Sequence, residues 1–289
     1  MARGSDGESV LRKHLRVLEA FDAFRPYLTL SEIADAAGLA ASSAHRLVTQ
    51  LEAEGLLERL PDKSYRLGVR LWEFAARTPS ALGLRELARP WMSGVHARIR
   101  QHTQLGVRSG RDVLFIERIS TPDAVVNATL IGGRTPLPVS SSGLVLLAHA
   151  EDDVVSDVIA AGWPRFTAHT TSDGEALREQ LRRVRSQGFA DLPGHIHDAS
   201  RGVAVPVLGP LGVVHAALGV VVSNDGSAAQ PIVELLTVAA TGIGRALQEA
   251  YLPDDESGRR RAGPLVSGSR ASLEYFAGRD ENHAASGLG

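Results

Sequence analysis

The sequence predicts an α+β protein with two domains, and three observations lead to this fold class. Within the first 70 residues, helical patterns are followed by two short strand patterns. Beyond about residue 103, several strand patterns follow one another through short turns, which is typical of an antiparallel sheet. Further helical patterns accompany these strands, without the regular strand–helix alternation or the Gly-rich turn of a dinucleotide-binding fold.

The composition sets the broad class of the protein. A chain of 289 residues, 44% of them hydrophobic, is long enough for two cores and excludes global disorder. The absence of cysteine excludes disulfides, thiolate metal sites and cysteine nucleophiles. No apolar run approaches the roughly 20 residues of a membrane span, and the N-terminus lacks the apolar core of a signal peptide. We therefore expect a soluble, cytoplasmic protein with no membrane partner.

The first domain is expected over residues 9–68, after a flexible N-terminus of residues 1–8. In residues 10–24, apolar side chains recur three and four positions apart, which predicts an amphipathic helix. Its buried face is expected to comprise Leu11, Leu15, Leu18 and Phe21.

A helix-turn-helix is predicted next. Thr29-Leu30-Ser31-Glu32 has the form of a capping box, in which a hydroxyl and a carboxylate three residues apart satisfy amides at a helix start. Gly38 ends this helix, a second helix begins at about Ser42, and Gly55 caps its end in the left-handed conformation. The inward side chains are expected to be Ile33, Ala37, Ala44, Leu47, Val48 and Leu51.

Two short strands, Leu56–Leu60 and Ser64–Leu67, follow and are joined by a turn at Pro61-Asp62-Lys63. This is the layout of a winged-helix DNA-binding domain, whose second helix enters the major groove. The residues expected to contact DNA are Ser42, Ser43, His45, Arg46 and Thr49 on this helix, and Lys63 and Ser64 on the wing. Residues 1–70 carry ten Lys or Arg and ten Asp or Glu, so binding has to rely on local clustering and on two or more copies.

Two of these DNA contacts have an alternative interpretation. Ser42 equally suits the N-cap position of the second helix, a role compatible with a DNA contact. Arg46 alternatively forms an ion pair within the chain, with Glu54 or another acidic residue. Arg59 and Arg66 are expected to lie on the wing surface.

A linker of residues 69–83 is expected between the domains. Its helical pattern from Val69 to Arg77 turns Leu71, Trp72 and Ala75 inward. Thr78-Pro79-Ser80 interrupts the helix, because proline disfavours the helical conformation of the residue before it.

The second domain is expected over residues 84–251, before a Gly- and Ser-rich, disordered tail of residues 252–289. Arg259 to Arg261 in this tail are expected to be solvated. Pro90 bends or restarts the first helix of the domain. The predicted helices are Leu84–Gln101, Ser142–His149, Asp152–Ala161, Asp173–Gln187 and Gln230–Tyr251. The predicted strands are Thr103–Arg108, Val113–Ile119, Val125–Ile131, Val203–Leu208 and Val213–Ser223.

Several sequence blocks point to a known family. The first domain contains Leu28-Thr29-Leu30-Ser31-Glu32-Ile33-Ala34, His45-Arg46-Leu47, Leu51-Glu52 and Tyr65-Arg66-Leu67-Gly68. The second contains Gly133-Arg134-Thr135-Pro136-Leu137-Pro138, Gly143 to Ala148, Gly188-Phe189-Ala190 and Ala204-Val205-Pro206-Val207. Through these blocks, in this order and spacing, residues 9–251 resemble the IclR-type (isocitrate-lyase-regulator) bacterial transcriptional regulators. The resemblance implies a GAF-like effector domain, a homodimer or homotetramer, and a palindromic operator in double-stranded DNA.

The resemblance also implies a small-molecule cavity on one face of the sheet of the second domain. One wall corresponds to Ser140, Ser141, Ser142, Gly143 and Leu144, where hydroxyls and free amides at a helix start favour an anion. The serines alternatively only cap that helix. The opposite wall departs from the family, since Gly202 takes a position often held by cysteine and Gly219 and Val221 replace small polar residues. Positions that are often acidic in the family fall near Leu192, Gly194 and His195.

These departures predict a roomier and less polar pocket than one built for a short keto acid, and hence a larger effector such as an aromatic acid. His195 and His197 are expected to supply a polar anchor. The effector-binding residues are therefore predicted to be Ser140, Ser141, Ser142, Gly143, Leu144, His195, Gly202 and Val221.

The resulting functional prediction is a DNA-binding repressor of a catabolic operon or of its own gene, controlled by an effector. An activator of the same family and a sensory or oligomerisation module without DNA binding are the alternatives. A hydrolase would need Ser200, His195 or His197, and Asp191 or Asp198 to act together, but no nucleophile-elbow motif is present. His195-Ile196-His197 is a weak metal motif. No catalytic residue, cofactor or metal is expected.

Overall fold

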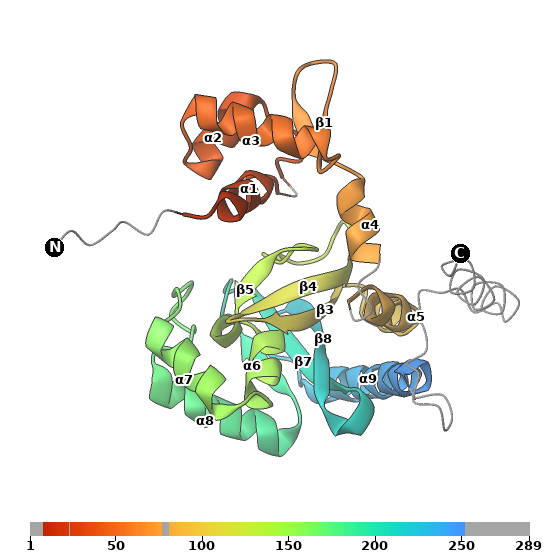
Figure 1. Ribbon diagram of the computed structural model, residues 1–289. Helices are drawn as coiled ribbons and strands as arrows, with labels where there is room; N and C mark the ends of the chain where they lie inside the picture. Colours follow the sequence, from red (N-terminus) through yellow and green to blue (C-terminus); the bar gives the residue numbers. More distant parts are fainter. Residues whose placement is uncertain (1–7, 23, 77–80, 252–289) are drawn as a thin grey trace, which may run out of the picture. The chain divides into compact units, whose positions relative to one another are not determined.

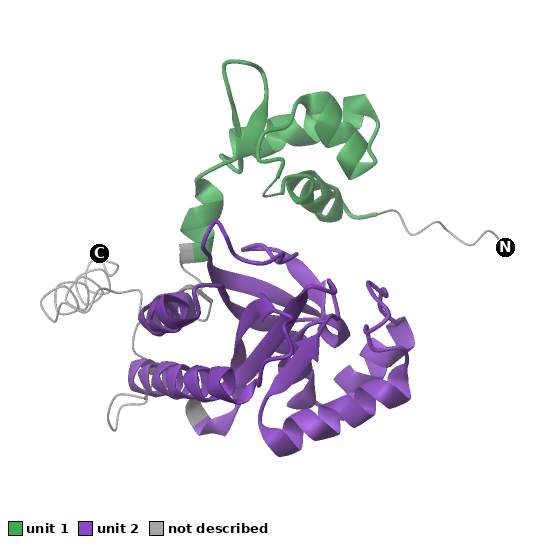
Figure 2. Cartoon of the chain, turned by 180° about the vertical axis from the view of Figure 1, so that it is seen from behind, with its two compact units in different colours: residues 1–78 green, residues 79–289 purple. Residues whose placement is uncertain are grey.

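The computed structural model describes residues 8–22, 24–76 and 81–251. The chain divides into two compact units, residues 1–78 and 79–289 (Figure 2). Residues 1–7 of the predicted N-terminal segment 1–8 lie outside the described residues, as do the break at Thr78-Pro79-Ser80 and the tail 252–289 with Arg259 to Arg261. No helix among the described residues is long and apolar enough to cross a membrane.

Unit 1 is a helix-turn-helix with a small wing. Its helices are α1 (Val10–Glu19), α2 (Leu30–Ala37), α3 (Ala41–Ala53) and α4 (Arg70–Ala76), and its strands are β1 (Leu57–Arg59) and β2 (Tyr65–Leu67) (Figure 1). The two strands form an antiparallel ribbon, and Tyr65 also exchanges backbone hydrogen bonds of 3.0 and 2.7 Å with Leu28. These bonds attach the wing to the segment that precedes α2.

Local signals in the sequence account for α2 and α3. The predicted capping box is confirmed, because the Glu32 carboxylate accepts from the Thr29 amide at 2.7 Å and the Thr29 hydroxyl accepts from the Glu32 amide. Gly38 and Gly55 adopt positive φ angles of 59° and 68°, as expected for residues that end these helices. The predicted inward residues are all buried: Ile33, Ala37, Ala44, Leu47, Val48 and Leu51.

The predicted burial of α1 and α4 is partly wrong. In α1, which ends at Glu19, Leu11 and Leu15 are exposed, whereas Val17 is fully buried. The helix carries two neighbouring apolar stripes, and periodicity alone does not tell which one faces the core. In α4, Trp72 is 65% exposed, because the core of unit 1 is already closed by α1 to α3 and the wing.

Unit 2 is built on a six-stranded antiparallel sheet in the order β5-β4-β3-β8-β7-β6. The strands are β3 (His102–Ser109), β4 (Asp112–Ile119), β5 (Arg134–Pro136), β6 (Ala190–Pro193), β7 (Ser200–Leu208) and β8 (Val214–Ser223). The predicted α+β class with an antiparallel sheet is therefore confirmed. Four of the five predicted strands correspond to β3, β4, β7 and β8, while β5 and β6 were not predicted.

Helices cover both faces of this sheet (Figure 1). The helices α5 (Ala81–Ile99) and α9 (Gln230–Tyr251) pack on one face, where Val203, Val205 and Val207 of β7 point. The helices α6 (Ser141–Ala148), α7 (Asp152–Ala161) and α8 (Gly174–Gln187) cover the other face, to which Ala204 belongs. Because side chains alternate along a strand, Gly202 also faces the α6 side.

The predicted strand Val125–Ile131 is wrong, since this segment has no regular structure. Its backbone groups bind side chains instead of a neighbouring strand. The Val125 amide donates to Gln101 at 2.9 Å, and the Val125 carbonyl lies 2.6 Å from Nε2 of His102. The Thr129 amide donates to the Asn127 side chain at 3.0 Å. The segment therefore crosses the end of the sheet as a loop.

Candidate functional site

The outer surface of α3 carries most of the predicted DNA contacts. Ser42, His45, Arg46 and Thr49 are exposed, and Ser43 is half-buried. The Thr49 hydroxyl donates to the His45 carbonyl at 2.9 Å, which leaves its lone pairs free for a further donor. Gln50 on the same helix lies 3.0 Å from Nε2 of His14, a contact that links α3 to α1.

Arg46 is free to contact a ligand. Among residues 8–22, 24–76 and 81–251, no carboxylate lies within ion-pair distance of Arg46. Glu54, its proposed partner, binds Arg70 at 2.9 Å instead. The alternative interpretation of Arg46 as half of an internal Arg46–Glu54 pair is therefore wrong.

Two further predictions about the DNA-facing residues need correction. Ser42 is not the N-cap, because α3 begins one residue earlier and Ala40 occupies that position without a side-chain hydrogen bond. Ser64 is only 8% exposed, and its hydroxyl donates to Asp62 at 2.7 Å. This bond and the one from the Ser64 amide hold the pKa of Asp62 below its usual value. Ser64 thus stabilises the wing turn and is not available to DNA, whereas Lys63 at the tip is exposed.

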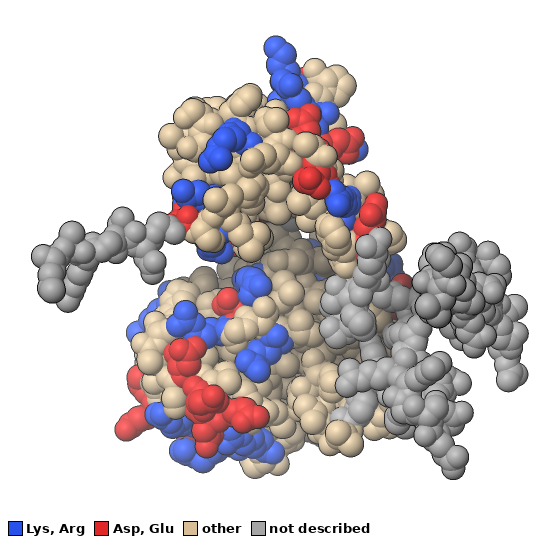
Figure 3. All heavy atoms as spheres, in the orientation of Figure 1, with Lys and Arg blue, Asp and Glu red and all other residues tan. Residues whose placement is uncertain are grey.

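Positive charge is not gathered into one patch on unit 1. On the face that Figure 3 shows, Lys and Arg side chains alternate with Asp and Glu and form no continuous basic patch. On the wing, Arg66 forms an ion pair of 2.9 Å with Glu58 on the neighbouring strand, and Arg59 lies 5.8 Å from the Tyr65 ring centroid. Both arginines therefore lie on the wing surface and are held within the chain.

Unit 2 contains a cavity at the N-terminal end of α6. Gln104 of β3, Gly202 of β7 and Val221 of β8 form its floor, Ser140 and Ser141 form one wall, and residues 126–129 and 195–197 close it. Its volume of about 40 Å³ has room for roughly three water molecules. This volume does not confirm the prediction that the pocket is larger than one built for a short keto acid. The size of the effector stays a prediction.

Five of the eight predicted effector-binding residues line this cavity. They are Ser140, Ser141, His195, Gly202 and Val221. Ser142, Gly143 and Leu144 do not, because they lie behind the wall in the core, where Ser142 and Leu144 are 0% and 1% exposed. Gly143 is needed there, since a Cβ atom at this position would lie 2.1 Å from the Leu137 carbonyl oxygen.

The serines at the start of α6 have different roles. The Ser140 hydroxyl accepts from the Gly143 amide at 3.0 Å and is the N-cap of the helix. Within the described part of the chain, the amides of Ser141 and Ser142 have no hydrogen-bond acceptor. They belong to the first turn of α6, where the helix dipole favours a negative charge. Capping by Ser140 therefore leaves donors for an anion.

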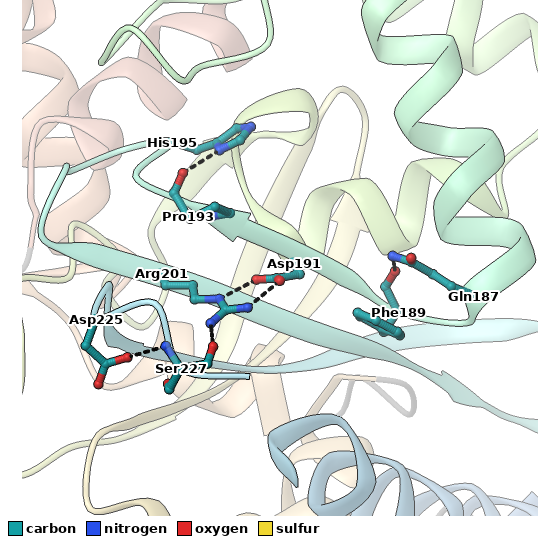
Figure 4. Close-up of polar contacts among 8 residues, drawn as sticks. All are labelled: Gln187, Phe189, Asp191, Pro193, His195, Arg201, Asp225 and Ser227. Carbon is teal, nitrogen blue, oxygen red and sulfur yellow. Dashed lines mark hydrogen bonds and ion pairs between the residues drawn. The ribbon is translucent and has the colours of Figure 1, made fainter. Parts of the chain in front are cut away.

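His195 is the most buried titratable group of the cavity. Its residue is 9% exposed, Nδ1 lies 3.2 Å from the Pro193 carbonyl oxygen, and Nε2 has no hydrogen-bond partner (Figure 4). Burial lowers the pKa of His195 below its usual value. His197 on the same loop is exposed, and its Nδ1 accepts from the Ala199 amide at 3.3 Å.

Comparison with known proteins connects both sites to one family. Residues 76–256 match the bacterial transcriptional regulator IclR C-terminal domain, and residues 10–61 match the IclR helix-turn-helix domain. The chain belongs to the IclR family of bacterial transcriptional regulators. The predicted resemblance is thus confirmed, together with DNA binding through the helix-turn-helix and a non-enzymatic role.

Regulators from several bacteria resemble this IclR-family chain. The HTH-type transcriptional regulator XynR of Escherichia coli is 29% identical over 199 residues, which cover 68% of this chain and 79% of XynR. The Pca regulon regulatory protein of Pseudomonas putida is 26% identical over 218 residues, which cover 73% of this chain and 72% of that protein.

One solved structure has a higher sequence identity to this chain than these two regulators have. It is the crystal structure of an IclR homologue from Microbacterium hydrocarbonoxydans in complex with 4-hydroxybenzoate. This homologue is 44% identical to the present chain, with a TM-score of 0.78, and the match covers 83% of this chain and 99% of the homologue.

The residues of the alternative hydrolase hypothesis are brought near one another but not into a catalytic arrangement. The Ser200 hydroxyl donates to the carbonyl oxygen of His197 at 3.1 Å and not to an imidazole. Asp191 binds Arg201 through two hydrogen bonds, one of them 2.6 Å long (Figure 4). Across the residues that the structure describes, no group of three or more His, Cys, Asp or Glu could hold a metal ion.

Sequence reasoning missed the polar floor of the cavity. Gln104 is 2% exposed, and its Oε1 accepts from Thr129 at 2.7 Å and from Asn127 at 3.2 Å. One signal for it was available, because Gln104 is a polar residue within a predicted strand whose neighbours are buried. Asn127 and Thr129 gave no such signal, since polar residues at alternating positions of the strand predicted at Val125–Ile131 indicate a solvent-facing side of that strand.

Proposed function

We propose that this IclR-family protein is a repressor of a catabolic operon or of its own gene, and that an aromatic carboxylic acid bound in the cavity of unit 2 controls it. The observation that carries the proposal is the cavity together with the 44% identical homologue that holds 4-hydroxybenzoate. The name of the Pseudomonas putida relative, which refers to the Pca regulon, supports the same effector class.

The cavity suits such a ligand chemically. The amide of Ser141 at the start of α6 would bind the carboxylate, and the side chains of Val139, Leu192 and Val221 would pack on the ring. A ring needs more space than about 40 Å³, so the cavity has to widen. The wall that can move is the loop 126–129. Ligand binding would therefore favour the arrangement of unit 2 in which this loop is displaced.

On the DNA side, we propose that α3 enters the major groove and that Ser42, Ser43, His45, Arg46 and Thr49 contact the operator together with Lys63 of the wing. Unit 1 has no net excess of basic residues, so a single copy would bind DNA weakly. A homodimer or homotetramer on a palindromic operator would combine the contributions of several copies. The protein would act in the cytoplasm, where its operator lies.

The test is a fluorescence-anisotropy titration of the full chain with DNA that flanks its own gene. It is carried out at two salt concentrations, with and without 4-hydroxybenzoate, benzoate or pyruvate. We expect specific, salt-dependent binding that an aromatic acid weakens and pyruvate leaves unchanged. Tighter binding with the aromatic acid would favour the activator alternative, which run-off transcription from the same promoter would confirm.

Two results would overturn the proposal. A response to pyruvate alone would show that the cavity takes a short keto acid. Binding of none of several genomic fragments at low salt would instead support a sensory or oligomerisation module that does not bind DNA.

A further inference from the structure

His195, which lines the cavity, carries a buried hydrogen-bonding atom that has no partner. The residue is more than nine-tenths buried and lines the cavity, yet its Nε2 has no hydrogen-bond partner. A buried polar atom without a partner costs free energy, so such an atom on a residue that lines the cavity points to a ligand group that would satisfy it.

The surroundings of His195 determine whether the ligand group at Nε2 must donate or accept a hydrogen bond. Nδ1 lies 3.2 Å from the Pro193 carbonyl oxygen, which can only accept, so the proton of the neutral ring is on Nδ1. Nε2 is consequently an acceptor. Burial lowers the pKa of the ring, which keeps it neutral near pH 7.

Two threonine hydroxyls from the segment between α7 and α8 hold the backbone around His195 in place. Its carbonyl oxygen accepts from the Thr170 hydroxyl at 2.6 Å, and the Gly194 carbonyl accepts from Thr167 at the same distance. The ring is therefore presented to the cavity from a fixed backbone.

Unlike Nε2 of His195, Gln104 and the start of α6 offer hydrogen-bond donors to the cavity. Oε1 of Gln104 already accepts two hydrogen bonds, which leaves the Gln104 amide hydrogens as donors. The start of α6 also offers an amide donor, that of Ser141. These donors suit the carboxylate of a ligand, while Nε2 of His195 suits only a group that donates a hydrogen.

We infer that His195 is a specificity-determining residue of the effector cavity, whose Nε2 accepts a hydrogen bond from a ring hydroxyl of the effector. The inference rests on the proposed function of this cavity. Hydroxylated aromatic acids should be preferred to acids that lack the hydroxyl, because the latter would leave Nε2 buried and unpaired.

Calorimetric titration of the full chain with 4-hydroxybenzoate, 4-methoxybenzoate and benzoate tests this inference. The methoxy compound keeps the oxygen but lacks the hydrogen. We expect 4-hydroxybenzoate to bind about tenfold or more tightly than the other two, because they leave a buried acceptor without a partner.

Three variants locate the preference. In His195→Phe, which has no acceptor, 4-hydroxybenzoate and benzoate should bind with similar affinity. In His195→Gln, whose side-chain oxygen can accept the hydroxyl, part of the preference should return. His215→Phe is the matched control, because His215 is exposed on β8 and does not line the cavity, and it should keep the preference of the wild-type protein.

The outcomes separate this inference from the proposed function. If none of the three acids binds the wild-type protein, the proposed effector class is wrong and the role of His195 falls with it. If the acids bind with equal affinity, or if His195→Phe keeps the preference, His195 does not read the hydroxyl although the cavity remains the effector site. Loss of the preference in His215→Phe as well would show that the effect is not specific to His195 and would overturn the inference.

Discussion

Single residues determine the space in the effector cavity and the contacts available on the DNA-facing surface of α3. A Cβ atom at Gly202 would lie 2.8 Å from the Ser141 hydroxyl oxygen, so this glycine keeps the space in front of α6 open. At the other site, Arg46 is exposed and has no acidic partner among the described residues. Both positions therefore allow a substitution that tests a site while leaving the fold in place.

Gly202→Ala should weaken binding of 4-hydroxybenzoate by about 1 kcal/mol or more, because the methyl group displaces the Ser141 hydroxyl and fills the cavity. The measurement is a calorimetric titration. Gly94→Ala is the control, since a Cβ atom there meets nothing within 4 Å, and it should raise the free energy of unfolding by about 0.5–1 kcal/mol without affecting binding. Unchanged affinity in Gly202→Ala would show that the ligand does not reach this wall.

Arg46→Ala should weaken operator binding by about 1–3 kcal/mol if the guanidinium contacts a guanine, or lower the salt slope by about one if it contacts a phosphate. Anisotropy titrations at several salt concentrations distinguish the two cases. Arg182→Ala on α8 of unit 2 removes another exposed arginine and should change neither quantity. Equal DNA affinity of Arg46→Ala and wild type would disprove the assignment of α3 as the DNA-reading helix.

At the scale of elements, β4 contacts both the cavity loop and α5. Arg118 donates to the Thr129 carbonyl, and its amide donates to the neighbouring Glu117 at 3.0 Å. Glu117 is 3% exposed on its side chain and binds Arg85 at 2.9 Å and Arg89 at 3.3 Å, both on α5. This carboxylate therefore attaches α5 to the sheet.

Glu117→Gln should lower the free energy of unfolding of the protein by about 1–2 kcal/mol, because a neutral amide replaces a charge-assisted acceptor of two arginines. The loss stays moderate since both arginines remain accessible to water. Thermal or urea unfolding measures it. Glu86→Gln, an exposed position on α5, should change stability by less than about 0.5 kcal/mol. Equal stability of the two variants would contradict a structural role for the Glu117 cluster.

At the scale of the whole molecule, buried histidines make stability depend on pH. His102 is 7% exposed, and its ring lies between Ser120 at 2.8 Å and the Val125 carbonyl at 2.6 Å. Burial, helped by the nearby positive charges of Arg118 and His96, lowers its pKa from the usual value. The pKa of His195 is lowered by burial as well. Both rings are thus neutral in the folded protein at a pH where the unfolded chain begins to bind protons.

The free energy of unfolding should therefore be highest above about pH 6.5, where both states are neutral at these positions, and should fall as the pH decreases toward 5. Carboxylates such as Glu32 and Asp173, whose pKa values hydrogen bonds lower further, titrate below this range. Urea unfolding at several pH values measures the slope, which should be smaller in His102→Gln. A pH-independent stability between pH 7 and 5 would contradict this account.

Features that depend on neighbouring residues were predicted correctly, whereas a feature that depends on distant segments of the chain was not. The bounds of α7 and α9 coincide with the predicted ones, and the capping box of α2 is confirmed, because these features depend on residues within a few positions of each other. The strand predicted at Val125–Ile131 fails because its backbone binds the side chains of Gln101 and His102, far along the chain.

The sequence by itself determined the family, the α+β class and the position of most helices, since periodicity, caps and short blocks are local properties of the chain. Only the tertiary structure decided which polar residues meet in the cavity. Gln104, Thr129, Ser141, His195 and Gly202 are far apart in sequence and come together because strand pairing and helix packing place them at one end of the sheet. Tertiary packing also buried Ser64 and Ser142, whose local sequence is equally compatible with an exposed site. Burial depends on contacts between distant segments, and a local pattern contains no record of them.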